Sequence, residues 1–395
     1  MSGVAKKMQT FAESSSWIRK MFEEGARMKA EFGADKVFDF SIGNPDVPPP
    51  AKFSTVLREL VEQEEPGVHG YMANAGFPLV REAIAKRLSA EQQVSFTAND
   101  LLMTCGAAGG LNVLFKALLD PGDEVMVFAP YFVEYRFYVD NHGGEVKVVA
   151  TDADFNLDLK GIEAALSAKT KIVLINSPNN PTGQIYPASD LQALGKLLDA
   201  AGKRFNTTIY LVSDEPYRNI VFDNHVVPPL MTATTNAIIA SSYSKELSLP
   251  GERIGYLAVH PQMADKAQVV GAMTLATRIL GFVNAPALMQ RAVARLQDVS
   301  ADSSIYARRL EAFCTVLDGA GISYVRPKGA FYLFPQAPID DDVEFCRLLA
   351  EQKILAVPGR GFGMPGYIRL AFCVDERVIA GSAEGFKRAM AAARK

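Results

Sequence analysis

A lysine among small hydroxyl residues lies in the middle of the chain. Lys245 follows Ser242 and Ser244, and Arg253 comes eight positions later. An isolated lysine is usually a solvated surface charge, but hydroxyl donors and a fixed guanidinium group can together hold a phosphate. An amine beside a phosphate site is the arrangement needed to form a Schiff base with pyridoxal phosphate. We therefore interpret Lys245 as a candidate attachment point for this cofactor.

Two further polar stretches each follow a bare apolar run. The first, Asn-Ser-Pro-Asn-Asn-Pro-Thr-Gly, occupies residues 176–183, and the second, Ser-Asp-Glu-Pro-Tyr, occupies residues 213–217. An acid at the end of a buried strand is costly unless a cation meets it, so Asp214 could face a protonated pyridine nitrogen. Tyr217 could reach a phenolic oxygen, and Asn180 could donate a hydrogen bond to a ligand. The structural alternatives are an ion pair or helix cap for Asp214 and a well-built turn around Asn180.

A third candidate is the turn Gly106-Ala107-Ala108-Gly109-Gly110, which precedes a helical pattern. Small residues there leave the backbone N–H groups accessible at the positive end of a helix, where a phosphate binds well. A tight strand-to-helix turn explains this composition about as well.

These stretches need a scaffold that brings them together. Short apolar runs alternate with helical periods from about residue 100 to residue 260, which favours a mostly parallel sheet covered on both faces. In such a sheet the loops that leave the carboxyl ends of the strands build the site. Lys245 is expected on a short loop between buried strands at residues 237–240 and 254–259.

The domain organisation is predicted from chain length and changes of pattern. A chain of 395 residues exceeds the size of one typical core, so two domains are expected. The predicted boundaries give an N-terminal arm and part of the small domain at 1–48, a large cofactor-binding domain at 49–285, and a small C-terminal domain at 286–395. Beyond residue 285 the sequence predicts long helices and a few strands that alternate with polar residues.

Composition limits the classes of function. A hydrophobic fraction of 49%, a charged fraction of 22% and a net charge of −3 are typical of a soluble enzyme and favour neither nucleic acid nor an anionic membrane as partner. The four cysteines lack a CxxC pair and the four histidines lack ligand spacing, so reduced thiols and no metal site are expected. No secretory signal or membrane span is recognised, and a cytoplasmic location is the expectation.

Taken together, the motifs resemble those of the class I/II, fold-type I pyridoxal-phosphate-dependent aminotransferases, most closely in type the prokaryotic aspartate, alanine and aromatic aminotransferases. The resemblance runs from residue 43 to residue 369. It implies an α/β fold: a large domain with a mostly parallel seven-stranded sheet covered by helices, and a smaller α+β domain built from both termini. The matching motifs are Asn-Asn-Pro-Thr-Gly at 179–183, Asp-Glu-Pro-Tyr at 214–217, Ser-Tyr-Ser-Lys at 242–245, Gly251 with Arg253, Pro-Gly at 358–359 and Tyr-Ile-Arg-Leu at 367–370.

The resemblance also implies a role for each cofactor-binding residue. Lys245 would form the internal aldimine and then carry the proton, Asp214 would pair with the pyridine nitrogen, and Asn180 and Tyr217 would bind the ring oxygen O3′. Phe132 would stack on the ring, although a core phenylalanine explains that residue nearly as well. The phosphate would be held by Gly106, the amides of Ala107 and Ala108, Ser242, Ser244 and Arg253, with Ser242 preferred over Ser244 as the serine in contact.

The remaining implied roles concern substrate and assembly. Arg369 would grip the substrate α-carboxylate as a fork, with Asn180 beside it, and Gly43 would let the backbone close over the substrate. Tyr71 would reach the phosphate of the neighbouring subunit, which implies a homodimer with the site at the interface. Arg278 is a candidate for reading a substrate side chain, although a surface arginine is the commoner explanation.

The predicted reaction is transfer of the amino group of an L-amino acid to a 2-oxo acid, with 2-oxoglutarate as the expected acceptor, by a ping-pong mechanism. Burial and Arg253 should both favour the neutral amine that Lys245 needs to act as a base. One alternative is a lyase on the same scaffold that eliminates a β- or γ-substituent. A second is an effector-binding domain of a transcription regulator, against which the intact lysine weighs. The preferred amino donor stays open.

Overall fold

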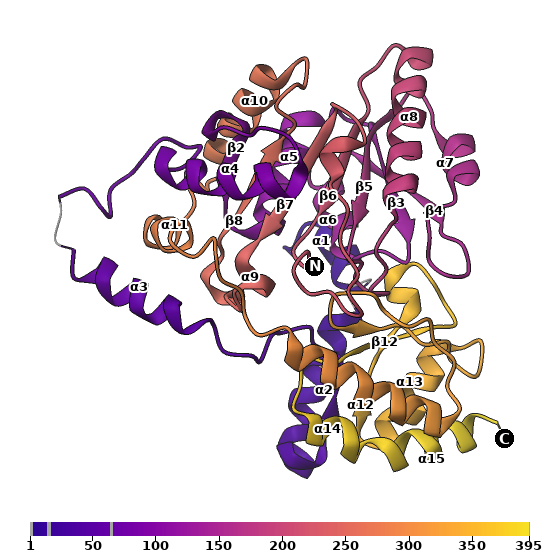
Figure 1. Cartoon of the computed structure of the whole chain (residues 1–395). Coiled ribbons are helices and arrows are strands. Elements are labelled where there is room, and N and C mark those ends of the chain that lie inside the picture. Colours follow the sequence, from indigo (N-terminus) through magenta and orange to yellow (C-terminus); the bar gives the residue numbers. More distant parts are fainter. Residues whose placement is uncertain (1–2, 14–16, 64–65, 395) are drawn as a thin grey trace.

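The structure is a computed structural model that describes residues 3–13, 17–63 and 66–394. Its centre is a seven-stranded sheet in the order β2-β8-β7-β6-β5-β3-β4 (Figure 1). All neighbours pair in parallel except β8, which is antiparallel to both β2 and β7. The predicted mostly parallel, seven-stranded sheet is therefore confirmed. The strands are β2 (Leu101–Thr104), β3 (Glu124–Ala129), β4 (Glu145–Ala150), β5 (Thr170–Asn176), β6 (Tyr210–Asp214), β7 (Ala237–Ser242) and β8 (Gly255–Val259).

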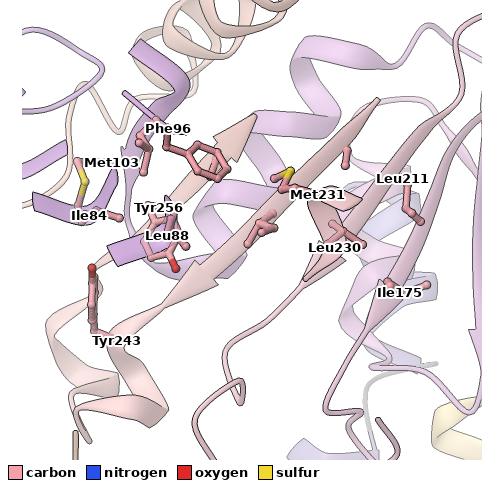
Figure 2. Packing of buried hydrophobic residues seen from close by; sticks show 14 of the residues in the cluster. Ile84, Leu88, Phe96, Met103, Ile175, Leu211, Leu230, Met231, Tyr243 and Tyr256 are labelled. Carbon is pink, nitrogen blue, oxygen red and sulfur yellow. The ribbon is translucent and has the colours of Figure 1, made fainter. Parts of the chain in front are cut away.

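The bare apolar runs of the central strands arise because both faces of the sheet are covered. In β5, Val173 and Ile175 pack into one core cluster, whereas Ile172 and Leu174 pack into another on the opposite face. Figure 2 shows the first cluster, in which Ile175 and other strand residues share a core with Leu88 of α4. Helices α3 (Ala51–Val61), α4 (Pro78–Gln92), α7 (Leu159–Ala165), α8 (Ala188–Phe205) and α11 (Ala287–Ala294) contribute to this cluster, and α5 (Gly106–Leu118), α6 (Glu134–Asp140) and α10 (Lys266–Ile279) contribute to the other.

The edge strand β4 was not predicted. Its sequence, Glu-Val-Lys-Val-Val-Ala, alternates between polar and apolar residues, and only Val149 is buried. Because β4 pairs on one side only, with β3, its partly exposed residues lack the continuous apolar pattern by which the central strands were recognised.

A second α+β part is assembled from the two ends of the chain. β1 (Phe38–Asp39) pairs in parallel with β10 (Ile354–Leu355), and β11 (Val357–Pro358), β12 (Ile368–Ala371) and β9 (Tyr332–Leu333) form a small antiparallel sheet. The predicted polar alternation is wrong, because these strands are short and all except β1 are buried throughout. The helices here are α2 (Trp17–Phe32), α12 (Ser304–Ala320), α13 (Asp342–Glu351), α14 (Glu376–Gly381) and α15 (Ala383–Ala393). The domain boundaries proposed from the sequence stay a prediction.

The remaining elements connect these two parts or cover the sheet. Helix α1 (Lys6–Glu13) packs on α6, where the rings of Phe11 and Phe137 meet edge to face at 4.9 Å. All four cysteines carry free thiols, as predicted. Within the described residues, no helix combines the length and apolar character needed to cross a membrane. The short elements are α9 (Tyr243–Glu246), η1 (Ala34–Lys36), η2 (Ala98–Asp100), η3 (Leu230–Thr232), η4 (Pro250–Glu252) and η5 (Gly359–Phe362).

Candidate active site

A cavity of about 300 Å³ lies at the carboxyl ends of β5, β6 and β7. It collects twelve of the side chains and backbone groups that the sequence predicted for one site. Gly106, Tyr71 and Arg278 are not among its lining residues. The predicted residues that line it are Gly43, Ala107, Ala108, Phe132, Asn180, Asp214, Tyr217, Ser242, Ser244, Lys245, Arg253 and Arg369.

Lys245 lies in the four-residue helix α9, between β7 and β8, where the sequence predicted a short loop between two buried strands. Strand β7 runs directly into this helix, so the backbone of Lys245 is fixed by the sheet. Its Nζ donates a hydrogen bond of 2.8 Å to the backbone oxygen of Gly43. The pKa of Lys245 is lowered to about 8, chiefly by burial and also by the nearby guanidinium groups of Arg369 and Arg253. A substantial neutral fraction at physiological pH is what a nucleophilic or basic lysine requires.

Asp214 is the last residue of β6 and is buried. Its Oδ2 accepts a hydrogen bond of 2.6 Å from the hydroxyl of Tyr135. Its Oδ1 is buried and has no hydrogen-bond partner among the described residues. Burial raises the pKa of Asp214 to about 7, and Glu215 raises it further while the Tyr135 hydrogen bond opposes the shift. A buried carboxyl oxygen without a donor, facing a cavity, is suited to a ligand that brings an N–H group and positive charge.

Arg369 is the buried cation on the opposite wall, contributed by β12. Its Nη2 donates to the backbone oxygen of Ser41 at 2.6 Å, and its Nη1 donates to Oδ1 of Asn180 at 3.3 Å. Its Nε has no hydrogen-bond partner in the part of the chain that the structure describes. The guanidinium group lies over the ring of Tyr332 and over that of Phe362, with centroid distances of 4.8 and 5.0 Å. No carboxylate of the described chain pairs with Arg369. A buried guanidinium group without a counter-ion fits a carboxylate ligand, and Arg binds carboxylates in a two-pronged manner.

The turn after β5 is organised by Asn176. This residue donates from Nδ2 to the backbone oxygen of Asp214 at 2.8 Å and accepts at Oδ1 from the backbone N–H of Asn180 at 2.7 Å. The amide of Asn180 is thereby placed at the cavity beside Arg369. Tyr217 follows the end of β6, and its hydroxyl lies 2.9 Å from that of Tyr332.

The far end of the cavity has the features of an anion site. Helix α5 begins at Gly106, so the N–H groups of its first turn lack helical partners. Gly106 has a φ of 73°, and a Cβ placed there would lie 2.7 Å from Nη2 of Arg253. The absence of a side chain at Gly106 therefore brings the start of α5 against the guanidinium group. Ser242 and Ser244 both line the cavity, so the choice between them stays a prediction.

Glycine is needed at position 43 because the side chain of Tyr332 lies very close to its backbone. A Cβ at this position would collide with the hydroxyl of Tyr332. Tyr332 thus occupies the space beside Gly43, which explains in packing terms why the sequence has glycine there.

Three important cavity residues were missed from the sequence: Tyr135, Asn176 and Tyr332. Tyr135 comes three residues after Phe132, a helical spacing, and the two rings meet edge to face at 5.5 Å. Asn176 pairs in register with Asp214, so the same position on two adjacent strands could have signalled it. Tyr332 belongs to a two-residue strand, and nothing in its local sequence marks it as a site residue.

Two predicted residues lie elsewhere on the chain. Tyr71 is 91% exposed, and Arg278 lies near the end of α10. Neither contributes to the cavity of its own subunit, so their predicted roles depend on a second subunit.

Known aminotransferases resemble the chain over most of its length. The profile of the family described as "Aminotransferase class I and II" matches residues 35–384. The chain is 35% identical over 365 residues to an aspartate aminotransferase of Thermotoga maritima, covering 91% of this chain and 93% of the relative. It is 33% identical to an aspartate/prephenate aminotransferase of Thermus thermophilus, covering 88% and 89%. The crystal structure of an aminotransferase from Eubacterium rectale superposes with a TM-score of 0.96, at 37% identity and with all of both chains covered.

Proposed function

The chain belongs to the family of class I and II aminotransferases, and we propose that it binds pyridoxal phosphate at Lys245 and uses it to move an amino group from an L-amino acid to a 2-oxo acid. The chain is thus a transaminase. The proposal that the described cavity is its active site rests on one observation above all. A lysine with a lowered pKa, a buried carboxyl oxygen without a partner and a buried unpaired guanidinium group face the same cavity.

The shape and charge of the cavity fit this cofactor. Arg253, the first turn of α5 and the two serines suit a phosphate at one end. Oδ1 of Asp214 suits a protonated ring nitrogen, because that contact would give the buried oxygen the donor it lacks. The hydroxyl of Tyr217 and the amide of Asn180 suit a phenolic oxygen, and Phe132 contributes an aromatic ring to the wall.

When bound, the cofactor supplies an electron-withdrawing ring conjugated to the substrate nitrogen, which acidifies the Cα–H bond. The residues then have separate tasks. As a neutral amine, Nζ of Lys245 would accept the proton from the substrate Cα, hold it, and give it back later in the transfer. Asp214 would hold a negative charge against the ring nitrogen of the bound cofactor and so favour its protonated form. Arg369 holds the substrate α-carboxylate and so orients the Cα–H bond toward Lys245.

We propose 2-oxoglutarate as the amino acceptor and leave the donor to experiment. The relatives named above are an aspartate and an aspartate/prephenate aminotransferase, which makes a dicarboxylic donor the first candidate. The cations that line the cavity are Lys245, Arg253 and Arg369, and each already has a proposed task. A second substrate carboxylate would therefore need a cation from outside the subunit, such as Arg278 of a partner.

A homodimer is part of the proposal, because Tyr71 is assigned to the site of the neighbouring subunit. Mixing two inactive variants tests this assignment. A hybrid of Tyr71→Ala and Lys245→Ala subunits carries one site with both native residues, so activity should return on mixing. If Tyr71 served its own subunit, no hybrid site would be intact and mixing would restore nothing.

The function itself is tested by absorbance and labelling. The protein with pyridoxal phosphate should show a visible band that disappears on addition of an amino donor and returns with 2-oxoglutarate. Borohydride reduction followed by peptide mapping should place the label on Lys245. A panel of aspartate, alanine and aromatic donors then ranks the substrates. Release of ammonia and a 2-oxo acid without any acceptor would instead identify a lyase.

A further inference from the structure

Each of the two central residues of the site is followed by a glutamate whose side chain is at most 10% exposed. Glu215 follows Asp214 at the end of β6, and Glu246 follows Lys245 in α9. Asp214 and Lys245 line the cavity, whereas neither glutamate does. The two glutamates therefore lie behind the wall that carries the proposed chemistry.

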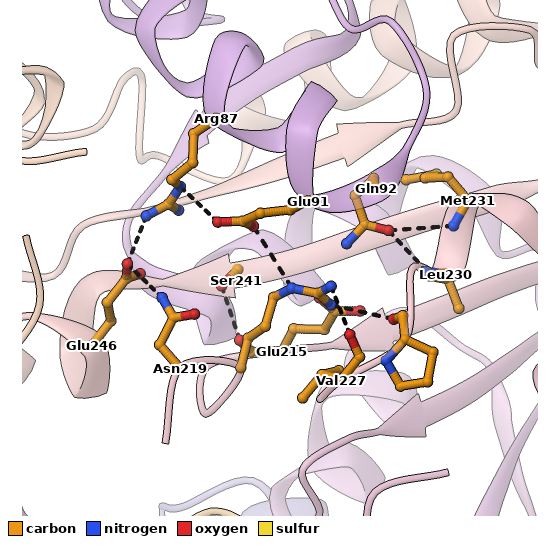
Figure 3. Close-up of polar contacts among 12 residues, drawn as sticks. Arg87, Glu91, Gln92, Glu215, Asn219, Val227, Leu230, Met231, Ser241 and Glu246 are labelled. Atoms are coloured by element: carbon orange, nitrogen blue, oxygen red, sulfur yellow. Dashed lines mark hydrogen bonds and ion pairs between the residues drawn. The ribbon is translucent and has the colours of Figure 1, made fainter. Parts of the chain in front are cut away.

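Side chains of α4 and of the turn after β6 connect the two glutamates (Figure 3). Arg87 donates from Nη1 to Oε1 of Glu246 at 2.6 Å, and its Nε lies 3.4 Å from Glu91. Glu91 in turn lies 3.6 Å from Nε of Arg218, and Nη1 of Arg218 donates to Glu215 at 2.9 Å. The result is one series of alternating charges, Glu246–Arg87–Glu91–Arg218–Glu215, which we call the ion chain.

Further contacts fix the ion chain to the site. Oε1 of Glu246 also accepts a hydrogen bond of 2.7 Å from Nδ2 of Asn219, two residues beyond Tyr217. The guanidinium group of Arg87 lies over the ring of Tyr243, the first residue of α9, at 5.6 Å. Arg218 donates from Nη2 to the backbone oxygen of Val227 at 3.0 Å. Both ends of α9 and both ends of the 215–219 turn are thus held by the same group of side chains.

Stability alone does not explain why charges occupy this place. Three carboxylates and two guanidinium groups leave one net negative charge, and four of the five side chains are at most 13% exposed. Taking such charges out of water costs several kcal/mol per ion, and well-packed apolar residues are often as stable or more so. What the charges provide is a fixed set of directional contacts between elements that are distant in sequence.

We propose that the ion chain positions Lys245 relative to Asp214, and thereby sets where the amine lies with respect to a ring held by the carboxylate. This inference rests on the proposed function, in which the two residues serve the same ring. Lys245 reaches the site from a helix of only four residues, which has little rigidity of its own. Because a misplacement of about 1 Å can cost about 10²-fold in rate, a helix this short needs support from behind.

The test compares Arg87→Met with a matched control, Arg347→Met. Arg347 also binds two glutamates, Glu344 and Glu351, but both belong to its own helix α13 and the contacts are exposed. Arg87→Met should lower kcat by about 10- to 100-fold with a smaller change in KM, because orientation and not substrate binding is lost. Arg87→Lys should recover part of the loss, since an ammonium group can replace one of the two contacts. Arg347→Met should leave kcat and KM unchanged.

The pH midpoint of the visible band is a second measurement, and it depends on the charge around Lys245. Removing Arg87 leaves more negative charge near Lys245, which should raise the pH midpoint of the visible band of the cofactor-loaded protein. Glu91→Gln removes a negative charge and should lower that midpoint, while kcat falls less than in Arg87→Met but more than in the control. A midpoint that moves in neither variant, or a Glu91→Gln variant identical to the control, would show that the five residues do not act on the site.

A double variant separates positioning from stability. Arg87→Met with Glu246→Leu replaces the buried pair by apolar side chains, and its cofactor-free form should unfold near the wild-type temperature. If the ion chain positions Lys245, the double variant should keep a low kcat and bind pyridoxal phosphate more weakly than wild type. Full recovery of kcat and of cofactor affinity in this double variant would mean that the ion chain only stabilises the fold. A wild-type protein without a visible band would refute the proposed function, whereas a normal wild-type band with unaffected variants would refute only this inference.

Discussion

The hydroxyl group of Tyr217 lies 2.9 Å from the hydroxyl group of Tyr332. Tyr217 belongs to the turn after β6 of the large sheet, and Tyr332 belongs to β9 of the small antiparallel sheet. The ring of Tyr332 also packs against the guanidinium group of Arg369 at 4.8 Å. One side chain thus contacts a residue proposed to bind the cofactor and a residue proposed to bind the substrate.

Replacing Tyr332 by phenylalanine should remove the hydrogen bond and keep the ring against Arg369. A net contribution of about 1 kcal/mol for such a bond predicts a loss of about fivefold in kcat/KM. Steady-state kinetics with the best donor measures this loss. Tyr324→Phe is the matched control, since its hydroxyl binds Asp318 in a surface contact away from the cavity. An equal effect in both variants would contradict a specific role for Tyr332.

Attachment of the cofactor should follow the titration of Lys245. Its pKa is lowered from 10.5 to about 8, chiefly by burial, and only the neutral amine attacks an aldehyde. The rate at which the visible band forms in cofactor-free protein should therefore rise with pH and level off above about pH 8. Lys245→Ala should fold normally but form no band and show no turnover. A rate that keeps rising to about pH 10.5, the value of a free lysine, would contradict the described environment.

Replacing Asp214 by asparagine should separate stability from activity. The folded-state pKa of Asp214 is raised from 3.8 to about 7 by burial, so between these values the folded chain holds a proton that the unfolded chain releases. The stability of the cofactor-free wild type should therefore fall as pH rises through this window, and the variant should lack that fall.

Melting curves of the cofactor-free proteins test whether stability falls as the pH rises. Wild type and Asp214→Asn should differ least in melting temperature near about pH 4, and the variant should melt increasingly higher than wild type as the pH rises to about 8. The same variant should bind pyridoxal phosphate more weakly and lose activity by orders of magnitude, since no negative charge holds the ring nitrogen protonated. A variant that is less stable than wild type at the higher pH would contradict the raised pKa.

Replacing Arg369 by alanine should weaken all amino and 2-oxo acid substrates alike. Loss of a buried charge pair with a ligand costs about 2–5 kcal/mol, which is roughly 30- to several thousand-fold in kcat/KM. Kinetics with an acidic, a small and an aromatic donor measures whether the effect is uniform. A loss confined to one donor would mean that Arg369 reads a side chain instead of the α-carboxylate.

Sequence patterns predicted those parts of the molecule that depend on neighbouring residues. The apolar runs of β5 and β6 and the polar residues after them, Asn180 and Asp214, are short-range signals, and the two strands end one or two residues beyond the apolar runs. The resemblance to a known family added Arg369 and Gly43, which no local pattern brings together. All four residues line one cavity.

Contacts that depend on packing could not be predicted in this way. Tyr332 meets Gly43 and Tyr217 only because a two-residue strand near the C-terminal end lies against the turn of the large sheet. Arg87 contacts Glu246, which is 159 positions away in the sequence. The residues around an arginine on a helix do not indicate so distant a partner. The helical conformation of α9 was also missed, since four residues are too few to show a period.

The reversed direction of β8 has a consequence for how the site comes together. Because β7 and β8 are antiparallel, the end of β7 lies beside the start of β8. Ser242, at the end of β7, and Arg253, just before β8, are therefore close together in one short connection. The loss of chain entropy on closing so short a segment is small and grows only slowly with length. Asp214 and Arg369, in contrast, are separated by 155 positions of sequence. The serines and Arg253 at the anion-facing end are therefore encoded within one short segment, whereas the start of α5 and Arg369 must be brought to the cavity from distant parts of the sequence.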